Sequence, residues 1–227
     1  GPQELGLDPH YSFGKNQVYP AGNFGWHLKP WQAAIDAGVS SIMPYYGVPI
    51  DVTYEGVTYE QTGMAFSKQI VTDLLRGKLG FKGYVNSDTG IINDRAWGLE
   101  GKTVPERVAA AINGGTETLS GFHDVKTITD LVAAGLLSEA RVTEAAKRLL
   151  EPMFKLGLFE NPYVDEGLAT AAVGAAASRT IGLDAQRKSI VLLQNRDSGG
   201  GKVLPLASTA RVYTMGIDSA DARQYFS

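Results

Sequence analysis

The sequence predicts an α/β protein built from parallel βαβ units. Apolar runs at residues 39–46, 81–88 and 116–121 alternate with amphipathic helical segments, and the connections between them are short. This alternation is typical of parallel strands joined by helical crossovers. Three such units do not close a sheet. They form either an open sheet or part of a barrel whose other strands lie upstream of Gly1.

The first part of the chain precedes these units. Residues 1–28 are rich in Gly, Asn, Tyr and Pro and are interpreted as loop, and residues 30–38 form a short helix that ends on a glycine. After the first strand, the sequence VTYEGVTYE at 52–60 predicts a small hairpin that turns at Glu55 and Gly56.

The crossover helices carry clear end signals. Residues 64–80 place their apolar side chains on one face and end on Gly80. Residues 103–114 begin with Thr103 as the N-cap and Pro105 in the first turn.

Two more helices are expected after the third strand, and the composition then changes. The second of these helices begins at Ser138 and bends or ends at Pro152. Residues 168–182 are rich in Ala and helical in pattern, and β-rich runs follow at 189–195 and 210–217. This change predicts a domain boundary near residues 165 to 185.

Composition excludes several classes of function. The chain has 227 residues, 44% of them hydrophobic and 20% charged, which is typical of globular proteins. A net charge of −3 without a Lys/Arg run argues against nucleic acid and membrane partners, and no stretch approaches the roughly 20 apolar residues of a membrane span. Cysteine is absent, and His27 and His123 lack a second ligand at metal spacing, so we expect neither a metal nor a cofactor.

A carboxylate stands where the second strand meets its loop. Asp88 ends this strand within GYVNSDTG, Tyr45 and Tyr46 end the strand before it, and Ser120 ends the strand after it. Functional groups of parallel α/β proteins gather at these strand ends. An isolated Asp there also serves as an N-cap or a turn former, so position alone leaves both roles open.

The surrounding sequence resembles family 3 glycoside hydrolases of the β-glucosidase and exo-glucanase branch. The segment LLRGKLGFKGYVNSDTG is similar to the region around that family's nucleophile, where Gly-Phe-x-Gly leads into an apolar strand and Ser-Asp. Further matching segments occur in the family's order and cover nearly the whole chain: DAGVSSIMPYY, AAAINGGTETLSG, KRLLEPMFKLGLFENPY and QRKSIVLLQNRDSGGGKVLPL.

The resemblance implies an organisation into domains. Residues 1–165 would be the C-terminal part of a TIM-like catalytic barrel, residues 166–188 a helical linker, and residues 189–227 the start of a second α/β sandwich domain. Both ends of the chain read as cuts through a longer polypeptide, although the leading Gly-Pro is also consistent with the scar of a cleaved tag.

The resemblance also implies an activity and a site. The enzyme would release terminal β-D-glucosyl residues from β-glucosides or β-glucan oligosaccharides with retention, through a covalent intermediate on Asp88. Retention needs a second carboxyl about 5–5.5 Å from the nucleophile. The family usually takes this acid/base from a Glu on the second domain, which would lie beyond residue 227, and its Lys-His-Phe-Gly glycone motif would end just before Gly1.

Four further residues are expected near the sugar. Tyr46 is placed to donate a hydrogen bond that keeps the nucleophile ionised, and Tyr45 lies beside it. Met43 is interpreted as core or as pocket wall. In many family members a Trp follows the nucleophile and stacks on the substrate, but Thr89 stands here. Trp97 either supplies a platform from the same loop or packs beneath it, and both interpretations stay open.

Other charged residues have simpler interpretations. Asp8 and His10 lie in a loop that would overhang the strand ends, where a surface role is expected. Asp94 and Arg95 are expected to be solvated charges, and Glu117 to be structural.

Two alternative functions remain. A β-N-acetylhexosaminidase of the same family is usually a single domain, so the linker and second-domain start argue against it. A non-catalytic carbohydrate-binding remnant belongs to a different class. Because an unclosed barrel exposes strand edges, we expect the missing N-terminal half as another polypeptide, or a strand-exchanged homodimer. A periplasmic or secreted bacterial location is favoured over the cytoplasm.

Overall fold

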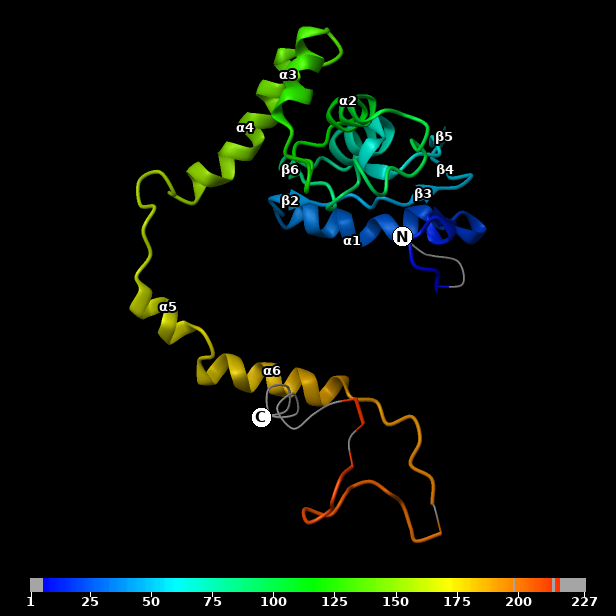
Figure 1. The fold of residues 1–227 in the computed structure, drawn as a ribbon, viewed down its shortest axis with the longest axis vertical. Helices are drawn as coiled ribbons and strands as arrows, with labels where there is room; N and C mark the ends of the chain where they lie inside the picture. The colour runs from blue at the N-terminus through cyan, green and yellow to red at the C-terminus, as the bar shows by residue number, and fades with distance from the viewer. Residues whose placement is uncertain (1–5, 198, 214, 217–227) are drawn as a thin grey trace. The chain divides into compact units, whose positions relative to one another are not determined.

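The computed structural model describes residues 6–197, 199–213 and 215–216 (Figure 1). The chain divides into two compact units, Gly1–Pro162 and Tyr163–Ser227, which are considered separately. Helices and short strands alternate in the first unit, in agreement with an α/β class.

The elements of the first unit are, in chain order, η2 (Ser12–Gly14), β1 (Asn16–Gln17), η3 (Pro20–Gly22), α1 (Phe24–Asp36), β2 (Ser41–Ile42), β3 (Val48–Pro49), β4 (Thr53–Tyr54), β5 (Val57–Thr58), η4 (Met64–Phe66), η5 (Gln69–Lys78), β6 (Tyr84–Val85), α2 (Val104–Gly114), α3 (Val125–Ala133) and α4 (Glu139–Lys155). The second unit contains α5 (Glu166–Ala172) and α6 (Ala176–Ser189).

Parallel strand pairs connected by helices define the first unit. β2 pairs with β6, and β1 pairs with β3, both in parallel. A single parallel bridge between Asn86 and Thr118 continues the pairing from β6 to the third predicted strand. The strands are shorter than predicted, because an apolar run forms a ladder only where a neighbouring backbone supplies hydrogen-bond partners. Only Ser41–Ile42 of residues 39–46 is strand, and residues 116–121 contribute the one bridge.

Two local predictions are confirmed. β4 and β5 form an antiparallel hairpin, and its turn residues Glu55 and Gly56 have φ values of 47° and 80°. Positive φ at both positions is typical of the tight type I′ hairpin turn. α2 begins after Thr103, whose side chain forms a reciprocal capping box with Glu106.

Other helix boundaries differ from the prediction. α1 begins at Phe24 rather than at Pro30, because Phe24 is buried among aromatic rings and its burial stabilises an extra first turn. α4 continues through Pro152 to Lys155, so this proline does not end the helix.

The predicted helix at 64–80 is broken into the short 3₁₀ turn η4 and the wider π-helix η5. Extended backbone at Ser67 separates the two pieces. At the end of η5 the N–H of Leu79 donates to the carbonyl of Leu74 at 2.9 Å, five residues back, which is the π-helical spacing.

The two β-rich runs of the second unit are not strands in the described residues, so this prediction is wrong there. Residues 189–195 are the end of α6 and chain without regular secondary structure, and the described part of 210–217 also forms no strand. Thr214 and Ile217 lie outside the described residues. An isolated bridge between Asp197 and Lys202 is present nearby. Extended apolar sequence forms a strand only beside another strand, and none lies beside these runs in the described chain.

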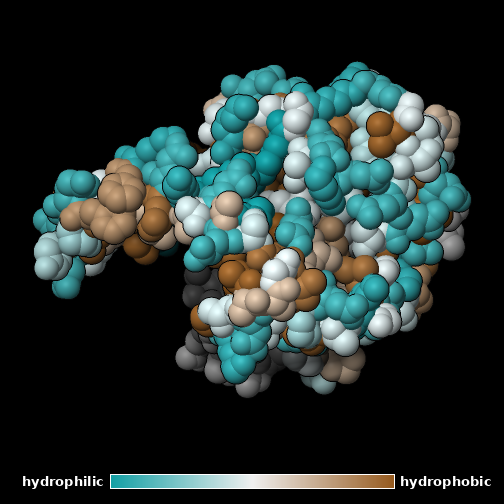
Figure 2. Space-filling view, turned by 90° about the horizontal axis from the view of Figure 1, so that it is seen from above, coloured by the Kyte–Doolittle hydropathy of each residue, from teal (hydrophilic) through white to brown (hydrophobic). Residues whose placement is uncertain are grey.

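Hydrophobic side chains are exposed at several places in the first unit. Figure 2 shows brown areas between hydrophilic ones on the face it draws. Large apolar side chains of the first unit that are exposed include Trp26, Trp31, Met43, Leu150, Met153 and Phe154. These side chains come from α1, from the segment after β2 and from α4. No helix among the described residues is long and apolar enough to cross a bilayer.

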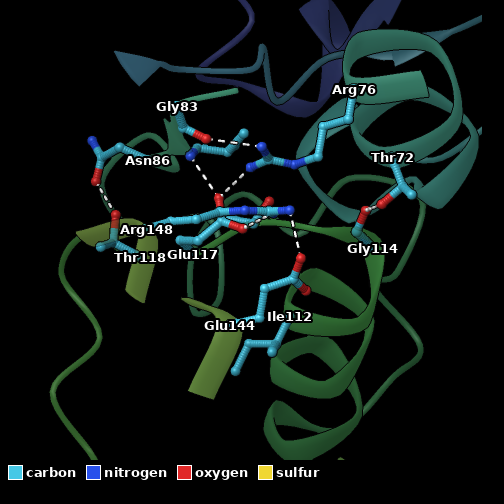
Figure 3. A network of polar contacts seen from close by, with 12 residues as sticks. Thr72, Arg76, Gly83, Asn86, Ile112, Gly114, Glu117, Thr118, Glu144 and Arg148 are labelled. Atoms are coloured by element: carbon cyan, nitrogen blue, oxygen red, sulfur yellow. Dashed lines mark hydrogen bonds and ion pairs between the residues drawn. The ribbon is translucent and has the colours of Figure 1, made fainter. Parts of the chain in front are cut away.

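A buried carboxylate joins the elements around β6 (Figure 3). The side chain of Glu117 is fully buried, and its Oε2 accepts hydrogen bonds from Arg76 of η5 and from the backbone N–H of Val85, both at 2.6 Å. Its Oε1 accepts from Arg141 at 3.1 Å and from Arg148 at 2.9 Å, both on α4. One carboxylate therefore connects η5, β6 and α4.

We expect Glu117→Gln to lower the free energy of unfolding by about 3–5 kcal/mol, because buried guanidinium groups lose their counter-charge while the side-chain volume is kept. Urea unfolding followed by circular dichroism measures the change. Glu144→Gln is the matched control, since Glu144 pairs with Arg148 at 2.5 Å but is 49% exposed. It should cost about 1 kcal/mol or less. Equal losses of unfolding free energy in the two variants would show that Glu117 contributes no more to stability than an exposed ion pair.

Candidate active site

Asp88 lies just beyond β6 with one carboxylate oxygen free. The side chain is half-buried, and Oδ1 accepts a hydrogen bond from the backbone N–H of Thr89 at 2.6 Å. Among the described residues, Oδ2 has no hydrogen-bond or ion-pair partner, and Asp88 caps no helix. The carboxylate is therefore held at one oxygen, while the other has no partner in the part of the chain that the structure describes.

The backbone on both sides of Asp88 is fixed to the third predicted strand. The N–H of Ser87 donates to the carbonyl of Thr118, and the N–H of Gly90 donates to the carbonyl of Ser120, both at 3.0 Å. The Ser87 hydroxyl oxygen also accepts from the N–H of Ser120 at 2.9 Å. These contacts hold Asp88 at the end of a paired segment, as the strand pattern predicts.

Tyr46 is buried beside this segment in a cluster of aromatic and charged groups. Its ring centroid lies 5.0 Å from that of Tyr45 and 5.6 Å from that of His10. Burial raises the pKa of Tyr46, Tyr45 and the charge of Asp88 raise it further, and Arg95 acts in the opposite direction. Tyr46 and Asp88 thus interact through charge. The predicted hydrogen bond between them is not present in the described structure.

The N-terminal loop covers Trp97. The indole N–H of Trp97 donates to the carbonyl of Pro9 at 3.0 Å, and the Lys15 ammonium lies 5.6 Å from the ring centroid. Lys15 also pairs with Glu100 at 2.5 Å. Trp97 is half-buried, and its contacts with Pro9 and Lys15 join it to the N-terminal loop.

The loop also carries a His–Asp pair next to Tyr46. Asp8 Oδ1 lies 2.7 Å from His10 Nδ1 and accepts from the His10 backbone N–H at 2.9 Å. These two contacts lower the pKa of Asp8. The loop that carries Asp8 and His10 is predicted to lie over the strand ends. In the structure the His10 ring contacts the ring of Tyr46.

Met43 lies in a different environment from Asp88. Met43 and Tyr45 line an apolar cavity of about 160 Å³ between α1 and η5, together with Trp31 and Leu74. Asp88 is not part of this lining. Of the predicted site residues, the structure brings Asp88, Tyr46 and Tyr45 together and places Trp97 under the neighbouring loop. It places Met43 in the cavity.

Arg95 is a site residue that sequence reasoning missed. Its predicted role was a solvated charge, but it is half-buried, and its guanidinium carbon lies 5.5 Å from the ring centroid of Tyr46. Its Nη2 donates to the carbonyl of Thr89, directly after Asp88. The signal in the sequence was its place in the loop that follows Asp88.

Comparison with known proteins identifies relatives of the chain. Residues 6–151 match the sequence model described as glycosyl hydrolase family 3 N terminal domain. Beta-glucosidase C of Emericella nidulans is 42% identical over 99% of this chain, and the periplasmic beta-glucosidase/beta-xylosidase of Dickeya chrysanthemi is 35% identical over 99% of it. The chain spans 37% and 36% of the lengths of these two relatives.

A solved structure has a similar fold. A β-glucosidase involved in saponin metabolism from intestinal bacteria superposes on 74% of this chain with a TM-score of 0.61 and 29% sequence identity. The match covers 21% of that protein's chain.

We expect Asp88→Asn to lower the pKa of Tyr46, because removing the carboxylate charge makes the tyrosinate less unfavourable. The titration can be followed by NMR of tyrosine labelled at Cζ, with Tyr46→Phe to assign the signal. Asp94→Asn is the control, since Asp94 is exposed in the same loop and does not contribute to this shift. An unchanged Tyr46 titration in Asp88→Asn would contradict the arrangement of the site.

Proposed function

The chain belongs to glycosyl hydrolase family 3, and from this premise we propose that it carries the nucleophile of a retaining β-glucosidase, with Asp88 in that role. The observation that supports this role most strongly is the geometry of Asp88. It stands at the end of a paired segment, with one oxygen bound to a backbone N–H and the other without a partner among the described residues. A nucleophilic carboxylate needs one such free oxygen.

The proposed reaction has two steps. The free oxygen of Asp88 attacks the anomeric carbon while a second carboxyl gives its proton to the departing glycosidic oxygen, and a glycosyl ester forms on Asp88. Water then attacks the same carbon, the second carboxylate takes the proton from that water, and Asp88 is released. Because the chain spans 37% of the length of its Emericella relative, we place the second carboxyl outside these residues.

We propose that the first unit is the C-terminal part of a TIM-like barrel. Its parallel pairs β1–β3 and β2–β6, and the bridge to Thr118, have the sense and the helical crossovers that such a barrel needs. The exposed apolar side chains and the cavity beside Met43 would pack against the remaining strands. We propose that these strands come from further polypeptide or, alternatively, from a second copy by exchange.

The names of the relatives support a proposed substrate and location. Those from Emericella and Dickeya are named as β-glucosidases, which favours release of a terminal β-D-glucosyl residue. The name of the Dickeya relative includes β-xylosidase activity and a periplasmic location. We therefore propose an exported enzyme with glucoside as its preferred substrate.

In the protein that carries this chain, Asp88→Ala should lower kcat on p-nitrophenyl β-D-glucopyranoside by several orders of magnitude, because no covalent intermediate can form. Its circular dichroism should stay unchanged. A 2-deoxy-2-fluoro-glucoside should attach to Asp88, and mass spectrometry of the labelled peptide identifies the site. Asp94→Ala, at an exposed position of the same loop, serves as the control and should keep wild-type activity. Label on any other carboxylate would reassign the nucleophile.

We expect the order of kcat/KM to be glucoside above xyloside, with the N-acetylglucosaminide lowest. The p-nitrophenyl glycosides of the three sugars allow a direct comparison. A preference for the N-acetylglucosaminide would support the hexosaminidase alternative. Binding of glucosides without hydrolysis of any of the three would support a carbohydrate-binding role.

A further inference from the structure

Arg95 is held beside Asp88 by contacts that a solvated arginine would not make. Its guanidinium group lies over Tyr46 and donates from Nη2 to the carbonyl of Thr89. Its Nε–H is buried and has no partner among the described residues.

The contact with Thr89 connects Arg95 to the carboxylate of Asp88. The N–H of Thr89 donates to Asp88 Oδ1 at 2.6 Å, and the carbonyl of the same residue accepts from Arg95. Thr89 is thus bound at both of its backbone polar groups. A change in the position of its carbonyl would rotate the backbone that orients the Asp88 carboxylate.

The turn after Asp88 is tightly packed around this contact. Gly90 has φ of 80°, and a Cβ at this position would lie 3.1 Å from Arg95 Nη2 and 2.9 Å from Asp94 Oδ2. On the other side, a Cβ on Gly121 would lie 3.1 Å from Thr89 Cγ2. Arg95 and Gly121 therefore both lie close to the backbone or side chains of this turn.

A second arginine, Arg107, holds the loop that runs from Asp88 to α2. Arg107 of α2 donates to the carbonyls of Leu99 at 3.2 Å, Ile92 at 2.9 Å and Glu100 at 2.9 Å. These contacts hold the loop from the helix side and do not include Thr89. The loop thus has one arginine for its own conformation and a second one at the turn beside Asp88.

We propose that Arg95 is a positioning residue, which holds the Thr89 carbonyl so that the free oxygen of Asp88 keeps the direction needed to attack the anomeric carbon. The inference rests on the proposed function of Asp88 and adds a residue to it. Arg95 acts through Thr89 and need not contact the sugar.

Arg95→Met should lower kcat on p-nitrophenyl β-D-glucopyranoside about 100-fold, the typical effect of a small misplacement of a reacting group, with KM changed by less than about threefold. Arg95→Lys should recover at least about tenfold of this loss, because an ammonium group can also donate to the Thr89 carbonyl. Arg107→Met is the matched control. It should lower the thermal unfolding temperature, and its loss of kcat should be much smaller than that of Arg95→Met.

A kcat of Arg95→Met close to the wild-type value would overturn the proposal. Equal kcat losses in Arg95→Met and Arg95→Lys, or in Arg95→Met and Arg107→Met, would also overturn it, because each pattern indicates a general structural role.

Amide hydrogen exchange in the protein that carries this chain gives a test that does not depend on catalysis. Arg95→Met should accelerate exchange at Thr89 and Gly90 and leave Thr118 unchanged, and unchanged exchange at Thr89 would overturn the proposal. If the wild-type protein hydrolyses none of the glycosides, the proposed function fails on its own. The exchange rates then still decide whether Arg95 holds the turn.

Discussion

The burial of one carboxylate, Glu117, is the constraint on which the first unit depends. Removing a charge from water is costly, and the cost is offset only by close opposite charges and hydrogen bonds. Glu117 meets this condition with three arginines and the N–H of Val85. Because these groups come from η5, β6 and α4, the carboxylate is stable only when all three elements are in place (Figure 3).

The geometry of the candidate site depends on this arrangement. Val85 is bound by Glu117, and the residues that follow it, from Asn86 to Gly90, pair with residues 118–120 up to the turn beside Asp88. The charged cluster lies at one end of this paired segment and Asp88 lies at the other. A rigid strand end is a more precise support for a reacting group than a free loop, which agrees with the position of functional groups in parallel α/β proteins.

Features that depend on local chemistry could be predicted from the sequence. The N-cap at Thr103, the hairpin turn at Glu55 and Gly56, and the place of Asp88 at a strand end each follow from a few neighbouring residues. Resemblance to a known family supplied the proposed role of Asp88, which position alone left undecided.

Features that depend on distant contacts could not be predicted. The extent of each strand is set by its partner. The strand predicted from the apolar run at 39–46 is therefore longer than the one that the structure contains, and the run at 189–195 forms none. The contact between Arg95 and Tyr46 joins segments far apart in the sequence. The place of Arg95 in the loop after Asp88 is a hint, but the exposed Asp94 shares that place, so it does not distinguish Arg95 from a solvated charge.

The hydrogen bond from Thr89 to Asp88 has an entropic consequence. A free carboxylate rotates about its last carbon–carbon bond, and a reaction that requires one orientation must remove this rotation. In this protein the 2.6 Å contact restricts this rotation during folding. The orientational order of the Asp88 carboxylate is then a property of the resting state, and in the proposed reaction substrate binding would have only to immobilise the sugar.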